Sequence, residues 1–324
     1  MADGKLQIWA VSDGRAGIEA QALGLAQAVA RLRSSEITTK RIVWRSGMGR
    51  LPWWLHPFPG RDLDPQSAIA PPWPDLWIGC GRAAVPLSMR LRRWSKGRTF
   101  VVQLQDPRAP AGAFDLVIPP RHDGLTGDNV LPIIGSPHRV TPERLAEDLA
   151  AFHETISALP HPRIAAMIGG KSKAFDLPPD RAAALSRQIE EAVSQAGGSL
   201  MMSFSRRTPD AARRILESRL RHLSGVIWDG EGPNPYFAFL AAADHILVTE
   251  DSVNMATEAA ATGKPVQILG LDGSSPKIEG LHAALQSRGI TRPFAGRLET
   301  WTYAPLNETD RAAREVLARM RGRA

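Results

Sequence analysis

Short apolar runs alternate with helix-compatible segments along the whole chain, and this alternation constrains the fold more than any other feature. In the first half it predicts strands at 6–11, 38–43, 76–79, 99–104 and 116–118, with helices at 16–32 and 83–94. In the second half it predicts strands at 163–168, 199–203, 225–227, 245–249 and 265–268, with helices at 180–195, 209–220, 235–242, 253–262 and 281–288. Strands that alternate with helices are typical of a parallel sheet covered by helices.

The length of 324 residues and the hydrophobic content of 43% allow two ordinary cores. A Leu-Pro-His-Pro stretch follows an amphipathic helix expected at 142–156 and precedes a new strand, which indicates a domain boundary. We therefore predict an α/β fold with two tandem Rossmann-like domains that face a central cleft. The predicted divisions are 1–158, 159–304 and a C-terminal helix within 305–324. In two-domain architectures of this kind, a terminal helix with no strand after it often returns to the first domain.

The composition limits the class of protein. Cys80 is the only cysteine, so no internal disulfide can form, and the sequence shows neither a charged-then-apolar leader nor an apolar run of about 20 residues. We therefore expect a soluble, cytosolic protein. The net charge of +7 comes mostly from arginine and favours anionic partners, because guanidinium groups bind phosphate and carboxylate well.

The segment 246–267 contains the most informative turn. An apolar run ends in a polar turn with Glu250 and Ser252, and an Ala-rich helical segment with Asn254 and Glu258 follows. In open α/β sheets such strand-to-helix turns bind ligands, and their free backbone N–H groups suit anions. Glu250 and Glu258 are eight positions apart, so Glu258 is expected on the ligand side about two turns into the helix. The pattern predicts a polar ligand that carries a phosphate.

A second candidate turn follows the first strand of the second half. Gly169 and Gly170 allow the backbone to approach a ligand closely, while Lys171 and Ser172 offer a charge and a hydroxyl. The spacing differs from the Gly-x-x-x-x-Gly-Lys-Ser of a Walker motif, so an ATPase is not indicated. The alternative interpretation is a tight turn with solvated lysines.

Two turns of the first half carry residues that are competent for binding. They are Ser12, Asp13, Gly14 and Arg15 after the first strand, and Gly81 and Arg82 after the third. For the first turn, a helix start capped by Ser12 or Asp13 is an equally good interpretation. Residues 79–84 also match Gly-x-Gly-x-x-Ala, but they follow the third strand, which gives only weak support for a dinucleotide site.

Asp106 and His122 are further candidates for acid–base chemistry. Asp106 ends the fourth strand, and His122 lies beside Asp123 after the fifth, where an imidazole that titrates near neutrality can act as a base. The alternative for His122 and Asp123 is a surface polar pair. The histidines lack metal-ligand spacing, so no metal site is predicted. Gly-x-Ser-x-Gly is absent, so a hydrolase elbow has no support.

Basic and aromatic residues gather in two stretches of the first half. The stretch 82–98 contains arginines and a lysine with no intervening acid, and 49–58 is a proline-punctuated aromatic segment that no helix or strand would readily absorb. Aromatic rings beside cations suit an anionic membrane surface. The alternatives are a solvated helix end and a cover over the core. No nucleic acid is expected as a partner, because no recognised binding module is present.

Several of these turns together resemble one protein family. The resemblance rests on residues 11–17, 78–82, 103–108, 168–173 and 249–258, and it covers nearly the whole chain. They are similar to the bacterial members of the mitochondrial fission protein family first described in plants. Those bacterial members are often described as nucleoside-diphosphate-sugar enzymes, and the plant member is associated with recruiting a dynamin-related protein to mitochondria. The resemblance therefore names the fold better than the activity.

The wider architecture is similar to that of GT-B glycosyltransferases and the related sugar-nucleotide epimerases. In many of those enzymes a Glu-x7-Glu element places its second glutamate on the donor's ribose and its helix amino terminus near the diphosphate. The resemblance implies this ribose role for Glu258 and, more weakly, a ligand role for Glu250. Residues 251–254 depart from the aromatic and glycine residues common there in retaining transferases, which leaves the stereochemistry open.

The resemblance thus implies a metal-independent glycosyltransferase that uses a nucleoside-diphosphate sugar as substrate, without a further cofactor, in cell-envelope glycan or lipid synthesis. The expected donor side comprises Gly169, Gly170, Lys171, Ser172, Arg206 or Arg207, Glu250, Ser252, Asn254 and Glu258. The expected acceptor side comprises Ser12, Gly14, Arg15, Gly81 and Arg82, with Asp13, Asp106 and His122 as candidate bases. Two alternatives stay open: an adaptor with this fold that binds a protein or a membrane, and a sugar-nucleotide epimerase. The oligomeric state and a peripheral location at the inner membrane also stay open.

Overall fold

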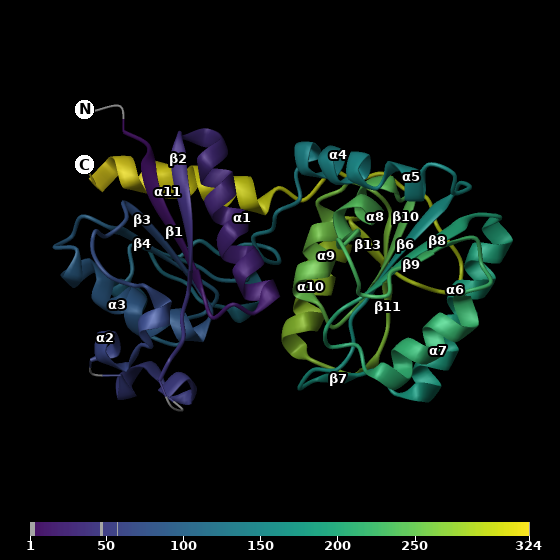
Figure 1. The fold of residues 1–324 in the computed structure, drawn as a ribbon, viewed down its shortest axis with the longest axis horizontal. Helices are drawn as coiled ribbons and strands as arrows, with labels where there is room; N and C mark the ends of the chain where they lie inside the picture. Colours follow the sequence, from purple (N-terminus) through teal and green to yellow (C-terminus); the bar gives the residue numbers. More distant parts are fainter. Residues whose placement is uncertain (1–3, 46–47, 57, 324) are drawn as a thin grey trace. The chain divides into compact units, whose positions relative to one another are not determined.

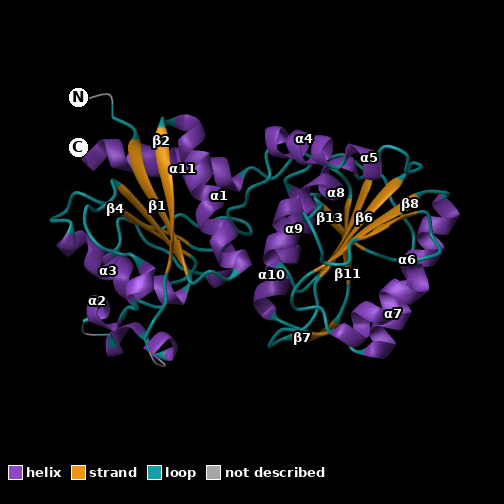
Figure 2. Ribbon diagram, viewed as in Figure 1, coloured by secondary structure: helices purple, strands orange, loops and turns teal. Residues whose placement is uncertain are grey.

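The computed structural model describes residues 4–45, 48–56 and 58–323, which divide between two compact units. Unit 1 lies within Met1–Arg139 and Asn307–Ala324, and unit 2 is Val140–Leu306. Each unit is a sheet covered by helices (Figures 1 and 2). Within the described part of the chain, no helix combines the length and the apolar character needed to cross a bilayer.

Five parallel strands form the sheet of unit 1. They are β1 (Leu6–Ser12), β2 (Ser35–Arg41), β3 (Leu76–Cys80), β4 (Phe100–Leu104) and β5 (Leu116–Ile118), in the order β2-β1-β3-β4-β5. Side chains of β1 alternate between two cores: Ile8 packs in the core that includes α1 (Ala16–Leu32), and Trp9 in the core that includes α3 (Val85–Trp94). Burial on both faces explains why the strand reads as a continuous apolar run.

Helix α11 (Glu308–Arg323) returns to unit 1 and packs beside α1 (Figure 1). Its Ala312 and Val316 are fully buried in the same core as α1. The N–H of His138 donates to the hydroxyl of Thr309 at 3.1 Å, which ties the start of α11 to the chain that leaves the first sheet. The last helix therefore completes the hydrophobic core of unit 1.

Six parallel strands form the main sheet of unit 2. They are β6 (Arg163–Ile168), β8 (Ser199–Phe204), β9 (Gly225–Ile227), β10 (His245–Thr249), β11 (Val266–Leu269) and β13 (Thr291–Pro293), in the order β13-β11-β10-β6-β8-β9. Helices α6 (Pro179–Ala196) and α7 (Asp210–Leu220) share one core with this sheet, and α8 (Tyr236–Ala242) and α9 (Val253–Ala260) contact its strands from the other side (Figure 2). The prediction of two Rossmann-like α/β sheets is confirmed.

The remaining elements are short or peripheral. They are α2 (Pro59–Asp62), α4 (Pro142–Ala151), α5 (His153–Ile156), α10 (Pro276–Gln286), the two-stranded sheet of β7 (Phe175–Asp176) and β12 (Asp272–Gly273), and the 3₁₀ turns η1 (Met48–Arg50), η2 (Trp53–Leu55), η3 (Pro65–Ser67), η4 (Arg82–Ala84), η5 (Ala111–Ala113) and η6 (Arg121–Asp123). The turns η1 and η2 thus cover parts of the aromatic segment 49–58, in which the sequence predicts no regular structure, and α2 follows it. Pro57 lies outside the described residues. The helix predicted at 142–156 is divided in two at Phe152.

The units divide at residue 139, whereas the sequence places the boundary at 158. The difference arises because α4 packs against α8 of unit 2. The guanidinium of Arg144 lies 4.8 Å from the ring of Phe237, and Thr141 caps α4 by accepting the N–H of Arg144 at 3.1 Å. The proline-rich segment at 157–162 is therefore an internal connection of unit 2.

Candidate functional site

Two of the predicted turns lie next to each other at the carboxyl edge of the unit 2 sheet. Their strands, β6 and β10, are neighbours, but the chain leaves β6 towards β8 on one side and later enters β10 on the other. Open α/β sheets bind ligands where the strand order reverses in this way. We therefore take the loop at 169–173 and the turn at 250–252 as the candidate site.

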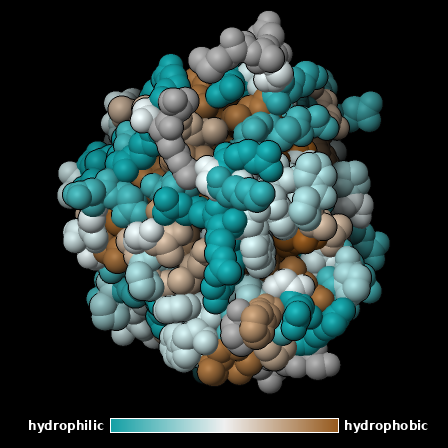
Figure 3. Space-filling model, turned by 90° about the vertical axis from the view of Figure 1, so that its left-hand side faces the viewer, coloured by the Kyte–Doolittle hydropathy of each residue, from teal (hydrophilic) through white to brown (hydrophobic). Residues whose placement is uncertain are grey.

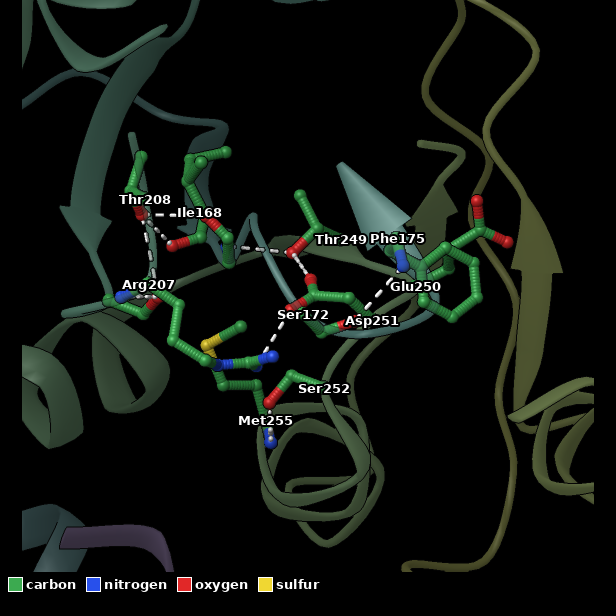
Figure 4. A network of polar contacts seen from close by, with 12 residues as sticks. Ile168, Ser172, Phe175, Arg207, Thr208, Thr249, Glu250, Asp251, Ser252 and Met255 are labelled. Atoms are coloured by element: carbon green, nitrogen blue, oxygen red, sulfur yellow. Dashed lines mark hydrogen bonds and ion pairs between the residues drawn. The ribbon is translucent and has the colours of Figure 1, made fainter. Parts of the chain in front are cut away.

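A chain of polar contacts joins these two turns (Figure 4). The N–H of Gly169 donates to Thr249 Oγ1 at 2.7 Å, and that hydroxyl donates to Asp251 Oδ1 at 2.8 Å. The side chain of Asp251 is fully buried. A Cβ at position 169 would collide with this carboxylate and lie 2.7 Å from its Cγ, so only glycine fits there.

Arg207, in the loop after β8, supplies a cation to the buried Asp251. Its Nη2 lies 2.7 Å from Asp251 Oδ2, while its side chain stays 42% exposed. The same loop supports the turn after β6, because Arg207 O accepts the N–H of Lys171 at 2.9 Å and Thr208 Oγ1 donates to Gly169 O at 2.6 Å. The sequence offers Arg206 and Arg207 equally, and the structure directs Arg207 into the site and leaves Arg206 exposed.

The other residues of the loop after β6 differ in how many contacts they make with the surrounding structure. Gly170 has φ of 150°, and a Cβ there would lie 2.8 Å from Arg207 O, so this position also requires glycine. Ser172 Oγ accepts the N–H groups of Ala174 and Phe175 at 3.1 and 3.0 Å and closes its own turn. Lys171 is 70% exposed at the side chain, and its Nζ lies 3.8 Å from an Asp176 carboxylate oxygen. Lys171 can therefore reach an anion by side-chain rotation.

Glu250 points away from this network (Figure 4). Its Oε1 accepts the N–H of Leu271 after β11, and its backbone oxygen lies 2.9 Å from His282 Nε2 of α10. The side chain therefore braces the turn, an orientation that differs from the one expected for a ligand-binding residue. A residue that precedes a helix has no side-chain direction fixed by the helical period, so the eight-residue spacing could not reveal this orientation.

Helix α9 presents its amino terminus at the site. Ser252 is its N-cap, and its Oγ accepts the N–H of Met255 at 3.3 Å. Asn254 lies in the first turn and is partly buried. First-turn N–H groups and the positive end of the helix dipole favour an anion at this position.

Glu258, two turns further along the chain from Ser252, is 8% exposed and accepts the O–H of Tyr236 at 2.7 Å. Burial raises the pKa of Tyr236 well above its usual value, and the carboxylate of Glu258 adds to this shift. Tyr236 is therefore a protonated donor that orients the carboxylate. No sequence pattern marks Tyr236, because its contact with Glu258 depends on how α8 and α9 lie together.

The first turn of unit 1 is closed by its own side chains. Ser12 Oγ accepts the N–H of Gly14 at 3.1 Å, and Asp13 Oδ1 accepts the N–H of Arg15 at 3.2 Å. The Arg15 guanidinium also pairs with Asp13 Oδ2 at 2.8 Å. Arg15 is the N-cap residue of α1 and makes no side-chain cap, so neither Ser12 nor Asp13 caps the helix.

The other predicted residues of unit 1 follow neighbouring strands. Gly81, after β3, has φ of 77°, and a Cβ there would lie 3.1 Å from Ile18. Arg82 beside it is exposed. Asp106, after β4, accepts the N–H of Arg108 at 2.8 Å, and His122 is half-buried in η6 after β5. Parallel strands place all of these residues along one edge of the sheet.

Gln105 is a further residue at this edge, and the sequence did not single it out as a site residue. Gln105 has φ of 67°, which is uncommon for a residue other than glycine and is enriched at functional sites. Its Nε2 donates to Gln21 Oε1 at 3.0 Å, and the buried thiol of Cys80 lies 3.5 Å from the same oxygen. Burial raises the pKa of Cys80, so this thiol stays protonated. Within the described residues, no three His, Cys, Asp or Glu side chains are grouped to hold a metal ion.

Comparisons with known proteins place this geometry in context. Residues 16–320 match the family described as mitochondrial fission ELM1. Mitochondrial fission protein ELM1 of Arabidopsis thaliana is 34% identical over 277 residues, which are 76% of this chain but only 65% of the plant protein, so the chain matches less than two thirds of its length. The uncharacterized protein RP120 of Rickettsia prowazekii is 28% identical over 353 aligned positions, which cover 95% of this chain and 97% of that protein.

Solved structures share the fold along almost the whole chain. UDP-GlcNAc 2-epimerase of Methanocaldococcus jannaschii, in complex with UDP-GlcNAc and UDP, gives a TM-score of 0.55 at 12% identity and covers 97% of this chain and 99% of its own. UGT89C1 of Arabidopsis thaliana, complexed with UDP, gives 0.50 at 13% identity and covers 97% and 91%. The epimerase of Neisseria meningitidis gives 0.52 at 11% identity and covers 98% and 100%. These likenesses show a GT-B-like fold.

Proposed function

The chain belongs to the mitochondrial fission ELM1 family, and from this premise we propose that unit 2 binds a nucleoside-diphosphate sugar and that the protein is a metal-independent glycosyltransferase. One observation carries the proposal: the Gly169 loop, Arg207 and the amino terminus of α9 converge where the strand order of unit 2 reverses. Proteins of the same fold support it, because the three described above were solved with UDP or UDP-GlcNAc bound.

In the proposed reaction, an acceptor hydroxyl forms a bond to the anomeric carbon of the sugar while the bond from that carbon to the diphosphate breaks. The nucleoside diphosphate leaves with the electron pair, and the acceptor proton passes to a base. Negative charge grows on the diphosphate during this step, and fixed donors lower the barrier. Lys171, Arg207 and the first-turn N–H groups of α9 are the proposed donors.

The ion pair with Asp251 is compatible with this role for Arg207. A guanidinium carries five N–H donors, so it can contact a carboxylate and a phosphate at the same time. The buried carboxylate of Asp251 orients the guanidinium, which leaves Arg207 partly exposed towards a ligand. A positioned cation is more effective than a freely rotating one, because less side-chain entropy is lost on binding.

Glu258 is the proposed partner of the ribose. A carboxylate can accept several hydrogen bonds at once, so the contact with Tyr236 is compatible with a contact to ribose hydroxyls. The acceptor side is proposed at the carboxyl edge of the unit 1 sheet, around Arg15 and Gly81. Asp13, Asp106 and His122 remain the candidate bases.

Thermal unfolding with nucleotides and sugar nucleotides tests the proposal. A ligand at about 100 times its dissociation constant adds about 2.7 kcal/mol of stability. We expect one nucleoside diphosphate to raise the melting temperature by several degrees, more than its nucleoside does, and EDTA to leave the shift unchanged. A melting temperature that responds to no nucleoside diphosphate would exclude the proposed donor.

Tyr236→Phe is expected to weaken nucleotide binding without loss of fold. The variant removes the O–H that orients Glu258, and hydrogen bonds to charged groups contribute about 1.5–3 kcal/mol, so affinity should fall about tenfold or more. Tyr303→Phe is the matched control, because the chain has only two tyrosines and Tyr303 donates to Lys264 O at 2.7 Å instead. Calorimetry that gives Tyr236→Phe and wild type the same dissociation constant contradicts the positioning role.

A sugar-nucleotide epimerase is the second candidate function. The observation that favours it is the match of the whole chain to UDP-GlcNAc 2-epimerases at TM-scores of 0.55 and 0.52. Incubation of the protein with a sugar nucleotide alone distinguishes the two activities. An epimerase converts the free sugar nucleotide in the absence of an acceptor, whereas a transferase needs the acceptor for glycosyl transfer.

A further inference from the structure

Exposed large apolar side chains gather in one short segment of unit 1. Leu51, Trp54, Leu55 and Phe58 are 39%, 62%, 49% and 62% exposed, and we call these four residues the apolar patch. Among the other large hydrophobic residues that the structure describes, only Leu32 and Val43 are comparably exposed. Figure 3 shows apolar side chains beside polar ones at the lower end of this face of unit 1. Such clustering on a soluble surface marks an interaction site.

The segment that carries the apolar patch is anchored to the body of unit 1. His56, within the segment, is 3% exposed, and its ring centroid lies 4.5 Å from that of Trp44. Its Nδ1 lies 3.4 Å from Asp62 Oδ2. The indole N–H of Trp53 donates to Arg108 O at 2.9 Å. The side chains of the apolar patch therefore project from a segment that is held in place by contacts with the rest of unit 1.

Cations accompany the apolar patch. Residues 41–61 contain arginines and no aspartate or glutamate. Arg45 and Arg61 are exposed, and the Arg61 guanidinium lies 5.3 Å from the ring of Phe58. Helix α3, which contacts α2 and η2, adds the exposed Arg93. Arg61 thus borders the apolar patch, and Arg45 and Arg93 add positive charge on adjoining elements; we call these three residues the positive rim. The acids that follow, Asp62 and Asp64, are half-buried.

We propose that this surface docks on a lipid bilayer that contains anionic lipids. The apolar patch enters the interfacial layer, where indole and phenyl rings are favoured, and Arg45, Arg61 and Arg93 contact headgroup phosphates. The positive rim complements the negative surface potential of an anionic leaflet. The inference is independent of the proposed transferase activity, because it rests on a surface of unit 1 and not on the donor site.

Sedimentation with vesicles tests the proposal. We expect the full chain to sediment with phosphatidylcholine vesicles that contain phosphatidylglycerol, to bind vesicles of phosphatidylcholine alone far more weakly, and to lose binding as salt rises. Trp54→Ser combined with Phe58→Ser should lower the partition coefficient at least tenfold. Leu32→Ser is the matched control, because Leu32 is 49% exposed outside the apolar patch, and it should bind as wild type does.

Charge reversal gives a second, independent comparison. Arg45→Glu with Arg61→Glu should abolish binding to anionic vesicles, whereas Arg187→Glu with Arg214→Glu, two exposed arginines of unit 2, should retain it at the same net charge. Melting temperatures establish that each variant is folded. A nucleotide response retained by the variants shows that a loss of vesicle binding does not come from damage to the donor site. Equal vesicle binding by patch variants and wild type overturns the proposal. The proposal is also overturned if the wild-type protein does not bind vesicles. This holds even if the protein self-associates and the patch variants abolish that self-association.

Discussion

We expect Glu258→Gln to abolish the thermal stabilisation by nucleoside diphosphates and to leave the fold intact. The amide keeps the volume of the side chain and an oxygen that accepts the O–H of Tyr236, so the packing between α8 and α9 is preserved. The substitution therefore weakens only the proposed hydrogen bonds between the side chain and the ribose hydroxyls. Two hydrogen bonds to a charged acceptor contribute about 3 kcal/mol or more, so the dissociation constant should rise at least about a hundredfold.

Glu250→Gln is the matched control for this experiment. Glu250 lies eight positions earlier, and its Oε1 accepts the N–H of Leu271, which the amide oxygen of glutamine can still do. Nucleotide affinity, measured by calorimetry on both variants, should fall for Glu258→Gln and stay unchanged for Glu250→Gln. The reverse pattern, or an unchanged affinity of Glu258→Gln, would remove Glu258 from the donor site.

Gly169→Ala is the substitution with the largest expected effect on stability. The added Cβ would lie 2.7 Å from Asp251 Cγ, so the buried carboxylate must move away from Thr249 and Arg207. Overpacking costs about 1–3 kcal/mol, and a displaced buried charge adds to this. We expect the melting temperature of unit 2 to fall on the order of 10 °C, with loss of the nucleotide response.

Two further variants show whether a collision with the Asp251 carboxylate causes the loss of stability in Gly169→Ala. Gly112→Ala adds the same methyl group in open space and should leave the melting temperature unchanged. Asp251→Ala is itself destabilising, but Gly169→Ala should cost much less in that background because the colliding group is gone. If Gly169→Ala destabilises the two backgrounds equally, the collision with Asp251 is not the source of the effect.

Much of the fold was accessible from the sequence because both sheets are parallel and buried on both faces. The apolar runs at 163–168 and 245–249 coincide with β6 and β10, and the predicted helix at 16–32 coincides with α1. The polar turns predicted after these two runs lie at the carboxyl edge of the unit 2 sheet, as expected. The family resemblance was confirmed by the match over residues 16–320.

The pair of Arg207 and Asp251 was not accessible from the sequence. The two residues follow β8 and β10, which are separated in the sheet by β6, so their contact depends on a strand order that no local pattern specifies. The contact of Tyr236 with Glu258 depends likewise on tertiary packing, between α8 and α9. The predicted boundary at 158 differs from the division at residue 139 for a related reason, since prolines mark a turn but do not tell which unit covers the apolar face of α4.

The return of α11 to the first unit has a consequence for the order of folding. Unit 2 is continuous in sequence from Val140 to Leu306, whereas unit 1 needs residues that emerge from the ribosome only after unit 2 has been made. Because α11 fills part of the core beside α1, the first unit synthesised is the last whose core can close. During translation, residues 4–139 therefore expose an apolar strip that α11 later covers, and such exposed apolar surface promotes aggregation of a nascent chain.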